Sequence, residues 1–225
     1  MNSKFSLIID FDSTIINLET LELLGSLSLE KNNQKQSIIK QISHYTNQAM
    51  NGDITFQESL DIRLKLLRIH KNHINKIIKV LNHSIDQSFL KNIDFFKQNL
   101  DNVYIVSGGF SSIIEPVLFS STDLNWNIFA NEFKFDDKDY VIGVNQKNPL
   151  AFSKGKVELV KQLNLKNDII IIGDGYTDYE IKKYGVAKYF LAYTAYAKRN
   201  NVINNADKIC ENFNQVIEFI TDKFQ

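Results

Sequence analysis

FSLIIDFDST, residues 5–14, is the most informative stretch of the chain, because an apolar run stands directly before two carboxylates. The run 5–9 is apolar on both faces and has the length of a strand, which suits a strand buried in a parallel sheet. Similar runs follow at 103–106, 169–172 and 189–192, and each ends in polar or glycine-rich sequence. The chain therefore offers four candidate strands of one sheet.

Helical spacing lies between or after these runs. Apolar residues recur at helical intervals over 110–117, 157–163 and 213–220, as they do in amphipathic helices. Strands that alternate with helices predict an α/β fold with a doubly wound, Rossmann-like parallel sheet. In such a sheet, ligands bind at the carboxyl ends of the strands. Reactive side chains are therefore expected directly after each strand.

One long stretch breaks the alternation, because residues 18–100 show helical spacing and no convincing strand. Its apolar stripes lie at 38–49, 56–67 and 74–81. The spacing predicts an all-helical unit inserted after the first strand. A unit in that position can close over a substrate.

The expected domains follow from this insertion. Residues 1–16 and 101–225 would form the α/β core, and residues 17–100 would form a helical cap domain. Within the core, apolar residues on either side of a polar turn at 136–139 predict a β-hairpin over 129–144.

Composition excludes several classes of protein. The 225 residues carry 26 basic and 26 acidic side chains, without the basic excess that nucleic-acid partners usually require. The single cysteine, Cys210, excludes an internal disulfide and any multi-thiolate metal site. No apolar stretch approaches the roughly 20 residues of a membrane span. We expect a cytoplasmic protein, a monomer or a homodimer, with no nucleic-acid or membrane partner.

The first candidate motif is the acidic pair Asp10 and Asp12, which follows the first strand. In an extended segment, carboxylates at i and i+2 point to the same side. Such a pair can hold a hard cation and can also act as nucleophile and as acid or base. An Asp-rich turn without chemistry is the alternative interpretation, and the pair alone does not exclude it.

The second motif, Ser107-Gly108-Gly109, follows the second strand. A hydroxyl and unobstructed amides at the start of a helix favour an anion site. A strand-to-helix turn that needs flexible glycines would have the same sequence. Both interpretations stay open at this motif.

The remaining motifs are Lys154 and the segment 173–178, Gly-Asp-Gly-Tyr-Thr-Asp. Asp174 and Asp178 follow the most apolar strand. A dinucleotide-binding fingerprint is excluded, because Asp178 stands where the third glycine belongs. Lys154 opens the preceding helix, where a lysine can neutralise a phosphate, although most lysines are simply solvated.

These four segments occur in one chain, and three of them directly follow predicted strands. Independent coincidences of this kind multiply to a small chance. Carboxylates, a hydroxyl–glycine turn and a lysine at one sheet edge together predict a magnesium-assisted phosphoryl site.

The four segments resemble the motifs of the haloacid dehalogenase-like (HAD) phosphatases, in that family's order and over nearly the whole chain. The insert is similar to the cap of the phosphoserine phosphatases in Glu19, in 49–56, in Ser59-Leu60 and in Arg63. The resemblance implies a hydrolase that removes phosphate from a small phosphomonoester.

The resemblance also implies roles for the core residues. Asp10 would attack phosphorus to form an aspartyl-phosphate, and Asp12 would protonate the leaving oxygen and later deprotonate water. Lys154 would be the third catalytic residue. Mg²⁺ would be held by Asp10, the main-chain carbonyl of Asp12 and Asp174, with Asp178 positioning Lys154 or a metal-bound water.

Phosphate and substrate contacts are implied in the same way. The expected phosphate-binding residues are Lys154, Ser107, Gly108, Gly109 and Thr177. In the cap, Glu19 would bind the ammonium of phosphoserine and Arg63 its carboxylate, while Met50 and Phe56 would exclude water. Without the family pattern, Glu19 and Arg63 would be interpreted as an exposed helix pair.

Two features depart from the family pattern. Tyr176 stands where many phosphoserine phosphatases have alanine, and 25–41 is longer and more polar. The four histidines lie in the expected cap without a nearby carboxylate to complete a metal set, so we expect them at the surface; they are His44, His70, His73 and His83.

The leading hypothesis is a phosphoserine phosphatase of serine biosynthesis. One alternative is a related phosphatase for another small phosphomonoester, or a phosphotransferase that passes phosphate to homoserine. Another is a catalytically silent metabolite-binding module on the same fold.

Overall fold

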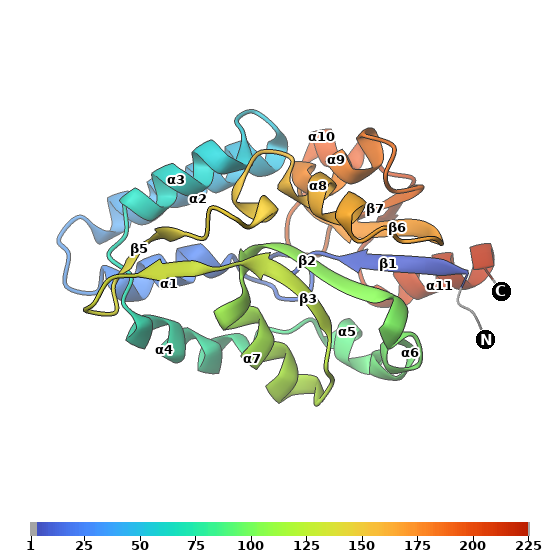
Figure 1. Ribbon diagram of the computed structural model, residues 1–225, viewed down its shortest axis with the longest axis horizontal. Coiled ribbons are helices and arrows are strands. Elements are labelled where there is room, and N and C mark those ends of the chain that lie inside the picture. Colours follow the sequence, from blue (N-terminus) through green and yellow to red (C-terminus); the bar gives the residue numbers. More distant parts are fainter. Residues whose placement is uncertain (1–3, 225) are drawn as a thin grey trace.

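Six parallel strands form the central sheet of the protein (Figure 1). The structure is a computed structural model that describes residues 4–224. The order of the strands is β3-β2-β1-β6-β7-β8, so β1 lies in the middle of the sheet. The bounds are β1 Phe5–Ile9, β2 Val103–Phe110, β3 Asn127–Asn131, β6 Asp168–Gly173, β7 Tyr189–Tyr193 and β8 Lys208–Cys210. The predicted doubly wound sheet is confirmed.

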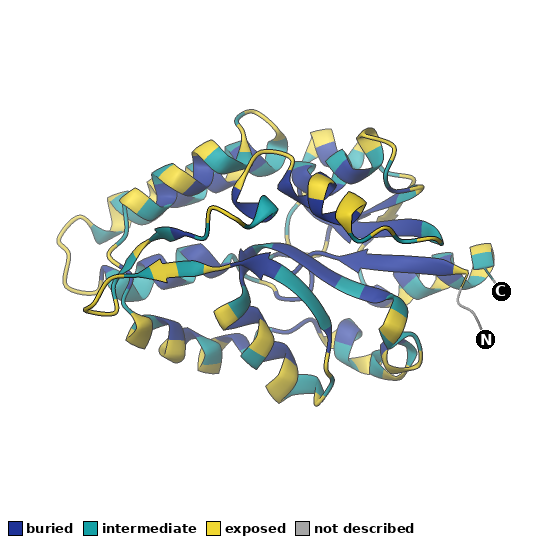
Figure 2. Ribbon diagram, in the orientation of Figure 1, coloured by how far each residue is buried: buried dark blue, intermediate teal, exposed yellow. Residues whose placement is uncertain are grey.

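Helices cover both faces of this sheet, because its strands bury side chains on both sides (Figure 2). Leu7 and Ile9 of β1 point to one face and Ile8 points to the other. On the first face lie α5 Gln87–Lys91, α6 Ile93–Gln98, α7 Ser111–Thr122 and α11 Phe213–Phe224. On the second lie α8 Gly155–Gln162, α9 Tyr176–Lys183 and α10 Asn200–Ile203. Short 3₁₀ turns, η1 Leu100–Asn102 and η2 Pro149–Ala151, precede β2 and α8.

The predicted insert is helical. It contains α1 Thr20–Ser28, α2 Lys35–Asn51, α3 Phe56–Lys65 and α4 Lys71–Leu81. Gly52 ends α2 in the left-handed conformation, with φ +86°, which glycine adopts without strain. Thr55 then caps α3, because its side chain accepts a hydrogen bond from the amide of Glu58. The turn 52–55 is therefore specified locally by its two end residues.

The chain enters and leaves the insert through two segments that are bonded to each other. Ile16 and Ile85 form an antiparallel bridge. The amide of Asn17 donates to the carbonyl of Ser84 at 3.0 Å, and the amide of Asp86 donates to the carbonyl of Ile15 at 2.8 Å. Both connections of the insert thus pass through one narrow joint.

The packing of α5 and α6 bears on the second boundary of the insert. Phe89 of α5 and Phe96 of α6 pack against Phe213 of α11, with ring centroids 5.1 and 5.8 Å apart. Both rings also pack against Trp126, just before β3. Because their apolar side chains are buried against core elements, α5 and α6 belong with the core. We therefore propose a cap of about residues 17–84 in place of 17–100.

The predicted hairpin over 129–144 is partly wrong. Asn127–Asn131 is β3, which pairs in parallel with β2 at the edge of the main sheet. The hairpin is shorter, with β4 Phe133–Phe135 and β5 Val141–Val144. It continues into a contact with the cap, where the amide of Val141 donates to the carbonyl of Ile69 at 2.9 Å.

Strand β8 was not predicted, because its three residues are too few to show a pattern. Among the described residues, none of the helices combines the length and the apolar character that crossing a membrane requires.

Candidate active site

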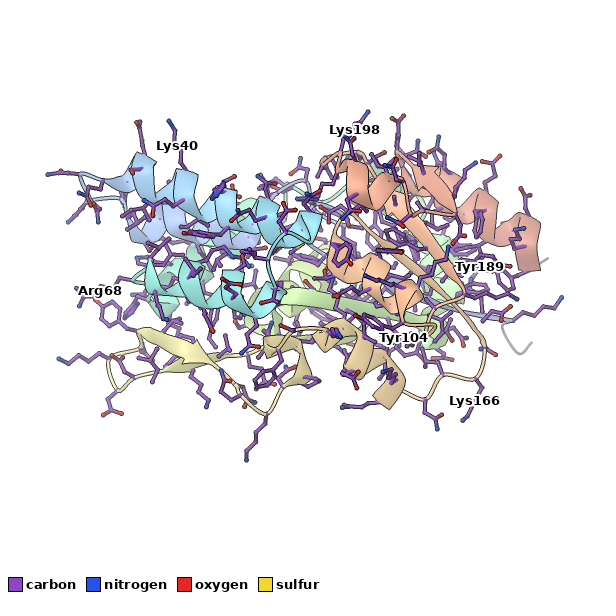
Figure 3. All side chains as sticks on the ribbon, turned by 90° about the horizontal axis from the view of Figure 1, so that it is seen from above. Lys40, Arg68, Tyr104, Lys166, Tyr189 and Lys198 are labelled. Atoms are coloured by element: carbon purple, nitrogen blue, oxygen red, sulfur yellow. The ribbon has the colours of Figure 1, made fainter. Side chains whose placement is uncertain are left out.

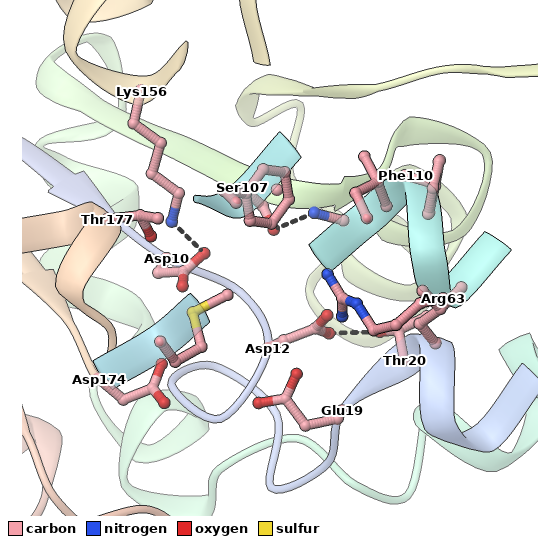
Figure 4. A pocket seen from close by; sticks show the side chains of 16 residues that line it. Asp10, Asp12, Glu19, Thr20, Arg63, Ser107, Phe110, Lys156, Asp174 and Thr177 are labelled. Atoms are coloured by element: carbon pink, nitrogen blue, oxygen red, sulfur yellow. Dashed lines mark hydrogen bonds and ion pairs between the residues drawn. The ribbon is translucent and has the colours of Figure 1, made fainter. Parts of the chain in front are cut away.

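A pocket lies at the carboxyl ends of β1, β2 and β6, beneath α1, α2 and α3 of the insert. Figure 4 shows that Lys156 and Arg63 enter it from opposite sides, with Asp10 and Asp12 between them. Apart from Lys154 and Asp178, the predicted site residues all line this pocket. They are Asp10, Asp12, Glu19, Met50, Phe56, Arg63, Ser107, Gly108, Gly109, Asp174 and Thr177.

Asp10 occupies the centre of the site, one residue beyond β1. Its amide donates to the carbonyl of Ile172 at 3.0 Å, which fixes its backbone against β6. Its Oδ1 accepts a hydrogen bond from the amide of Phe11 at 2.7 Å and lies 2.8 Å from Nζ of Lys156. Among the described residues, Oδ2 has no hydrogen-bond or ion-pair partner.

The lysine at the site is Lys156, and the expectation for Lys154 is corrected. Lys156 is only 6% exposed, and its Nζ lies 2.7 Å from Oδ1 of Asp178 as well as 2.8 Å from Asp10. Lys154 precedes α8 in a left-handed conformation, with φ +60°. Its exposed ammonium lies 4.5 Å from the ring centroid of Tyr184 instead. Lys154 lies outside the helix and Lys156 lies in its first turn, so the two side chains leave the backbone in different directions.

Three carboxylates converge next to this lysine. One oxygen each from Asp10, Asp174 and Asp178 can be chosen so that all three lie within 4.8 Å of one another. A set of carboxylate oxygens suits a hard divalent cation such as Mg²⁺. Burial raises the pKa of Asp174 to about 7 and that of Asp178 to about 8. A divalent cation at this cluster would offset the burial of these charges, so the residues fit the implied metal.

The side chain of Asp178 is itself part of this cluster. The sequence predicted for it only a supporting role. Its Oδ2 accepts from the amide of Gly175 at 3.1 Å, while its Oδ1 meets Lys156. A Cβ at Gly173 would lie 2.2 Å from the Asp178 carboxylate. Glycine at 173 is therefore what allows Asp178 to reach the end of β6.

Asp12 points into the same pocket but away from the carboxylate cluster. Its Oδ1 accepts a hydrogen bond from the hydroxyl of Thr20. Burial, followed by the charge of Glu19, raises the pKa of Asp12 well above its ordinary value. Thr20 was not predicted, since a threonine at the start of a helix carries no distinctive signal.

The segment 107–109 is part of β2, where the strand is irregular between Val106 and Phe110. The Ser107 hydroxyl accepts from the amide of Gly109 at 2.9 Å. A Cβ at Gly108 would lie 2.5 Å from the ring of Phe56. Glycine at 108 therefore lets the cap aromatic ring close onto the core backbone.

The insert contributes a basic and an acidic side chain. Arg63 of α3 is 4% exposed and donates to the Thr46 hydroxyl at 3.0 Å and to the Ser59 carbonyl at 3.2 Å. The Oε1 of Glu19 accepts from the hydroxyl of Ser13 at 2.7 Å. Both side chains face the pocket beside Asp12 in Figure 4. The structure thus brings opposite charges to the roof of the site.

Two further side chains complete the surroundings. The hydroxyl of Thr177 is buried with no hydrogen-bond partner among the described residues, and the residue lines the pocket. Arg199, in the loop after β7, donates to the carboxylate of Asp174 and, at 3.1 Å, to its main-chain carbonyl. Arg199 was not predicted, although its place shortly after an apolar strand was an available signal.

The histidines take no part in this site. The Nδ1 of His70 accepts from the amide of Asn72 at 3.0 Å, and the Nδ1 of His73 accepts from the amide of His70 at 3.1 Å. These bonds cap α4. Within residues 4–224, the carboxylate cluster is the one group of side chains suited to a metal ion.

Comparisons with known proteins agree with this geometry. A family model described as haloacid dehalogenase-like hydrolase matches residues 7–181. A chloroplastic phosphoserine phosphatase of Arabidopsis thaliana is 30% identical over 79% of this chain, which spans 61% of that protein's length. A phosphoserine phosphatase of Drosophila melanogaster is 27% identical over 92% of this chain and 75% of its own length.

A solved structure is also similar to this chain. It is the crystal structure of a phosphoserine phosphohydrolase-like protein from Francisella tularensis, with a TM-score of 0.86 and 30% sequence identity. The match covers 96% of this chain and 99% of that one. With motif carboxylates gathered at the sheet edge and a family model that matches most of its length, the chain belongs to the haloacid dehalogenase-like hydrolases.

Proposed function

We propose that the protein is a phosphoserine phosphatase that hydrolyses O-phospho-L-serine to L-serine and phosphate with Mg²⁺. The observation that carries this proposal is the position of Asp10. Its carboxylate lies beside a buried lysine and two further carboxylates, beneath a roof that carries Arg63 and Glu19. The names of the relatives support the choice of phosphoserine.

The charge of the site supports a divalent cation. Within the described residues, the pocket and its ion-pair partners hold five carboxyl groups against three basic groups. The carboxyl groups belong to Asp10, Asp12, Glu19, Asp174 and Asp178. We assign the cation to Asp10, Asp174 and the main-chain carbonyl of Asp12. When bound, it would shield the phosphate from the carboxylates that surround it.

The chemistry on the protein would take two displacements. Oδ2 of Asp10 attacks phosphorus, the bond from phosphorus to the serine oxygen breaks, and Asp12 gives its proton to that oxygen. Water then attacks phosphorus, Asp12 takes a proton from it, and Asp10 leaves as a carboxylate while phosphate is released. Lys156, Ser107 and the Gly108 amide, all of residues that line the pocket, would hold the phosphoryl oxygens.

Substrate recognition would use the opposite charges of the roof. Glu19 would bind the ammonium of serine, and the guanidinium of Arg63 would bind its carboxylate. Phe56 and Met50 would keep water out. A cytosolic location is part of this proposal, and the buried single cysteine, Cys210, is compatible with it.

Phosphate release tests the proposal. The protein with Mg²⁺ is assayed on a panel of phosphorylated amino acids, sugars and nucleotides, with and without homoserine as an acceptor. We expect phosphoserine to give the highest kcat/KM and water to be the acceptor. A sugar or nucleotide phosphate in first place, or transfer to homoserine, would replace phosphoserine hydrolysis by the corresponding alternative.

The variant Asp10→Asn tests the nucleophile in the same assay. We expect it to fold like the parent protein, judged by circular dichroism, and to release no phosphate above background. Retained turnover would mean that another group attacks phosphorus. Absence of any phosphate release by the parent protein would favour a silent binding module.

A further inference from the structure

Tyr176 borders the pocket without lining it. It is the first residue of α9 and stands between Gly175 and Thr177, at the edge of the site. Its half-buried ring turns towards the insert, where a Cβ added to Gly52 would lie 2.8–2.9 Å from three ring atoms. The ring of Tyr176 therefore lies directly against the main chain of Gly52.

Core residues hold the Tyr176 ring from the other side. Its hydroxyl accepts a hydrogen bond from Nζ of Lys183 at 2.6 Å. Its ring meets the ring of Tyr179 edge-on, with centroids 5.6 Å apart, and Tyr179 packs on Phe190 of β7 at 5.8 Å. Aromatic contacts of this kind fix the position of a ring. The core thus presents a flat aromatic surface to the insert.

The end of α2 rests on the core at three consecutive residues. A Cβ at Gly175 would lie 2.7 Å from Sδ of Met50. The carbonyl of Asn51 accepts from Nδ2 of Asn201 at 2.8 Å. Gly52 follows, on the ring of Tyr176. This row of contacts is where the tip of the insert meets the core.

Two apolar side chains of the insert, those of Met50 and Phe56, lie on either side of Gly52 in the sequence. Met50 and Phe56 both line the pocket. Outside them, Tyr176 borders an outer cleft of about 330 Å³ that shares Phe56 and Thr177 with the pocket. Movement of Gly52 away from Tyr176 would widen this cleft and withdraw both side chains from the site.

We propose that Tyr176 is a positioning residue on which the segment 50–56 docks, so that Met50 and Phe56 close over the substrate. Tyr176 acts through Gly52 and touches no reacting atom. The identity of the substrate rests on the proposed function, whereas the docking contact does not. This docking contact gives the ring of Tyr176 a role. Many of the phosphoserine phosphatases that the sequence resembles have alanine at this position.

A double-substitution cycle tests this proposal, with Tyr176→Ala, Gly52→Ala and the variant that carries both. The control is Tyr184→Ala, which removes another α9-terminal tyrosine that is 42% exposed. Each protein is measured for KM and kcat on phosphoserine. Without substrate, hydrogen–deuterium exchange is followed for the amides of 49–56.

We expect Tyr176→Ala to raise KM about tenfold without lowering kcat, since a lost aromatic contact shifts the insert towards an open state. The amides of 49–56 should exchange faster, while Tyr184→Ala should match the parent protein. Gly52→Ala should also raise KM, because its Cβ collides with the ring. In the Tyr176→Ala background, the same change should raise KM by less than about a further threefold, because the ring with which the Cβ collides is gone and only the backbone strain at residue 52 remains.

Tyr176→Phe keeps the ring and should behave like the parent protein. If Tyr176→Ala unfolds, judged by circular dichroism, Tyr176→Leu takes its place in the cycle. Additive effects of the two substitutions, or unchanged exchange and KM in the Tyr176 variant, would overturn the proposal. A parent protein that fails to hydrolyse phosphoserine would overturn the proposed function alone, because the exchange measurement needs no substrate.

Discussion

Lys156 reaches Asp10 from the first turn of α8, with 2.8 Å between its ammonium nitrogen and Oδ1. The same ammonium lies 2.7 Å from Asp178, so one buried cation links two of the three clustered carboxylates. The two carboxylates raise the pKa of Lys156 against the opposing effect of burial, and the lysine therefore stays charged.

Substitution of Lys156 should abolish most of the turnover, whereas substitution of Lys154 should leave it almost unchanged. Lys156→Ala leaves two buried carboxylates unpaired, which typically costs about 3–5 kcal/mol of stability, and we expect turnover to fall at least about a hundredfold. Lys154→Ala removes an exposed side chain and should keep turnover within about threefold of the parent protein. Steady-state kinetics and thermal unfolding measure both effects. Loss of turnover in the Lys154 variant alone would reverse the assignment.

Arg63→Ala should reduce kcat/KM for phosphoserine about tenfold to a hundredfold, because a charged hydrogen bond is worth about 1.5–3 kcal/mol. The ester p-nitrophenyl phosphate lacks a carboxylate and should lose much less. Since Arg63 also binds Thr46 and Ser59, Arg63→Lys provides a variant that keeps the charge in the cap. Equal losses on both substrates would show that Arg63 supports the fold of the cap and not the carboxylate.

Arg199→Ala should destabilise the protein in the absence of a divalent cation. The substitution leaves the buried carboxylate of Asp174 without its guanidinium, at a cost of about 3 kcal/mol, or about 6–12 °C in Tm. Mg²⁺ should raise the Tm of this variant more than that of the parent protein, because the cation replaces the lost positive charge. Thermal unfolding with Mg²⁺ or with a chelator measures both shifts.

Lys198→Ala is the matched control for Arg199. Lys198 lies at the rim of the molecule in Figure 3, and its side chain is 69% exposed. Its ammonium lies 3.4 Å from Oε1 of Glu211, away from the pocket. The control should match the parent protein under both conditions. Equal Tm shifts on cation addition in the Arg199 variant and the parent protein would contradict the prediction.

Asp86→Asn should reveal a pH-dependent contribution to stability. Burial raises the pKa of Asp86, but hydrogen bonds from Ser88, Tyr193 and Tyr196 outweigh it and hold that pKa below its ordinary value. Stability from such a group is present above the unfolded pKa of about 3.9 and is lost as pH falls through the folded pKa. We expect a loss of about 1–3 kcal/mol at pH 7.

The difference in the free energy of unfolding between Asp86→Asn and the parent protein should become smaller below about pH 4. Urea unfolding at pH 7 and at about pH 3 measures it. Asp137→Asn, at an exposed position in the β4–β5 turn, should be neutral at both pH values. A difference that stays constant with pH would mean that shape, and not charge, makes Asp86 important.

The sequence could predict the parts of the site that sheet geometry alone determines. Asp10, Ser107 and Asp174 meet because each lies at or just beyond the carboxyl end of a strand, and those ends share one edge of the sheet. β1 has the predicted bounds, since its apolar run begins and ends sharply.

Features that depend on the exact start of a helix, on the path of a loop or on a strand's position in the sheet could not be predicted. Lys154 directly precedes α8 and Lys156 lies in its first turn, and which of the two enters the site depends on where the helix begins. Arg199 reaches Asp174 because the loop after β7 returns to the end of the neighbouring strand β6. The strand β3 begins and ends with asparagine, and its side of the sheet is an edge, so its pattern is weak.

The bridge between Ile16 and Ile85 has a consequence for how substrate choice can diverge. Because the core holds the two ends of the insert side by side, a foreign helical unit with adjacent termini could be grafted at this joint without disturbing β1. The reactive carboxylates would stay in register while the roof above them was exchanged. A chimaera made at residues 17 and 84 would therefore inherit its chemistry from one parent and its selectivity from the other.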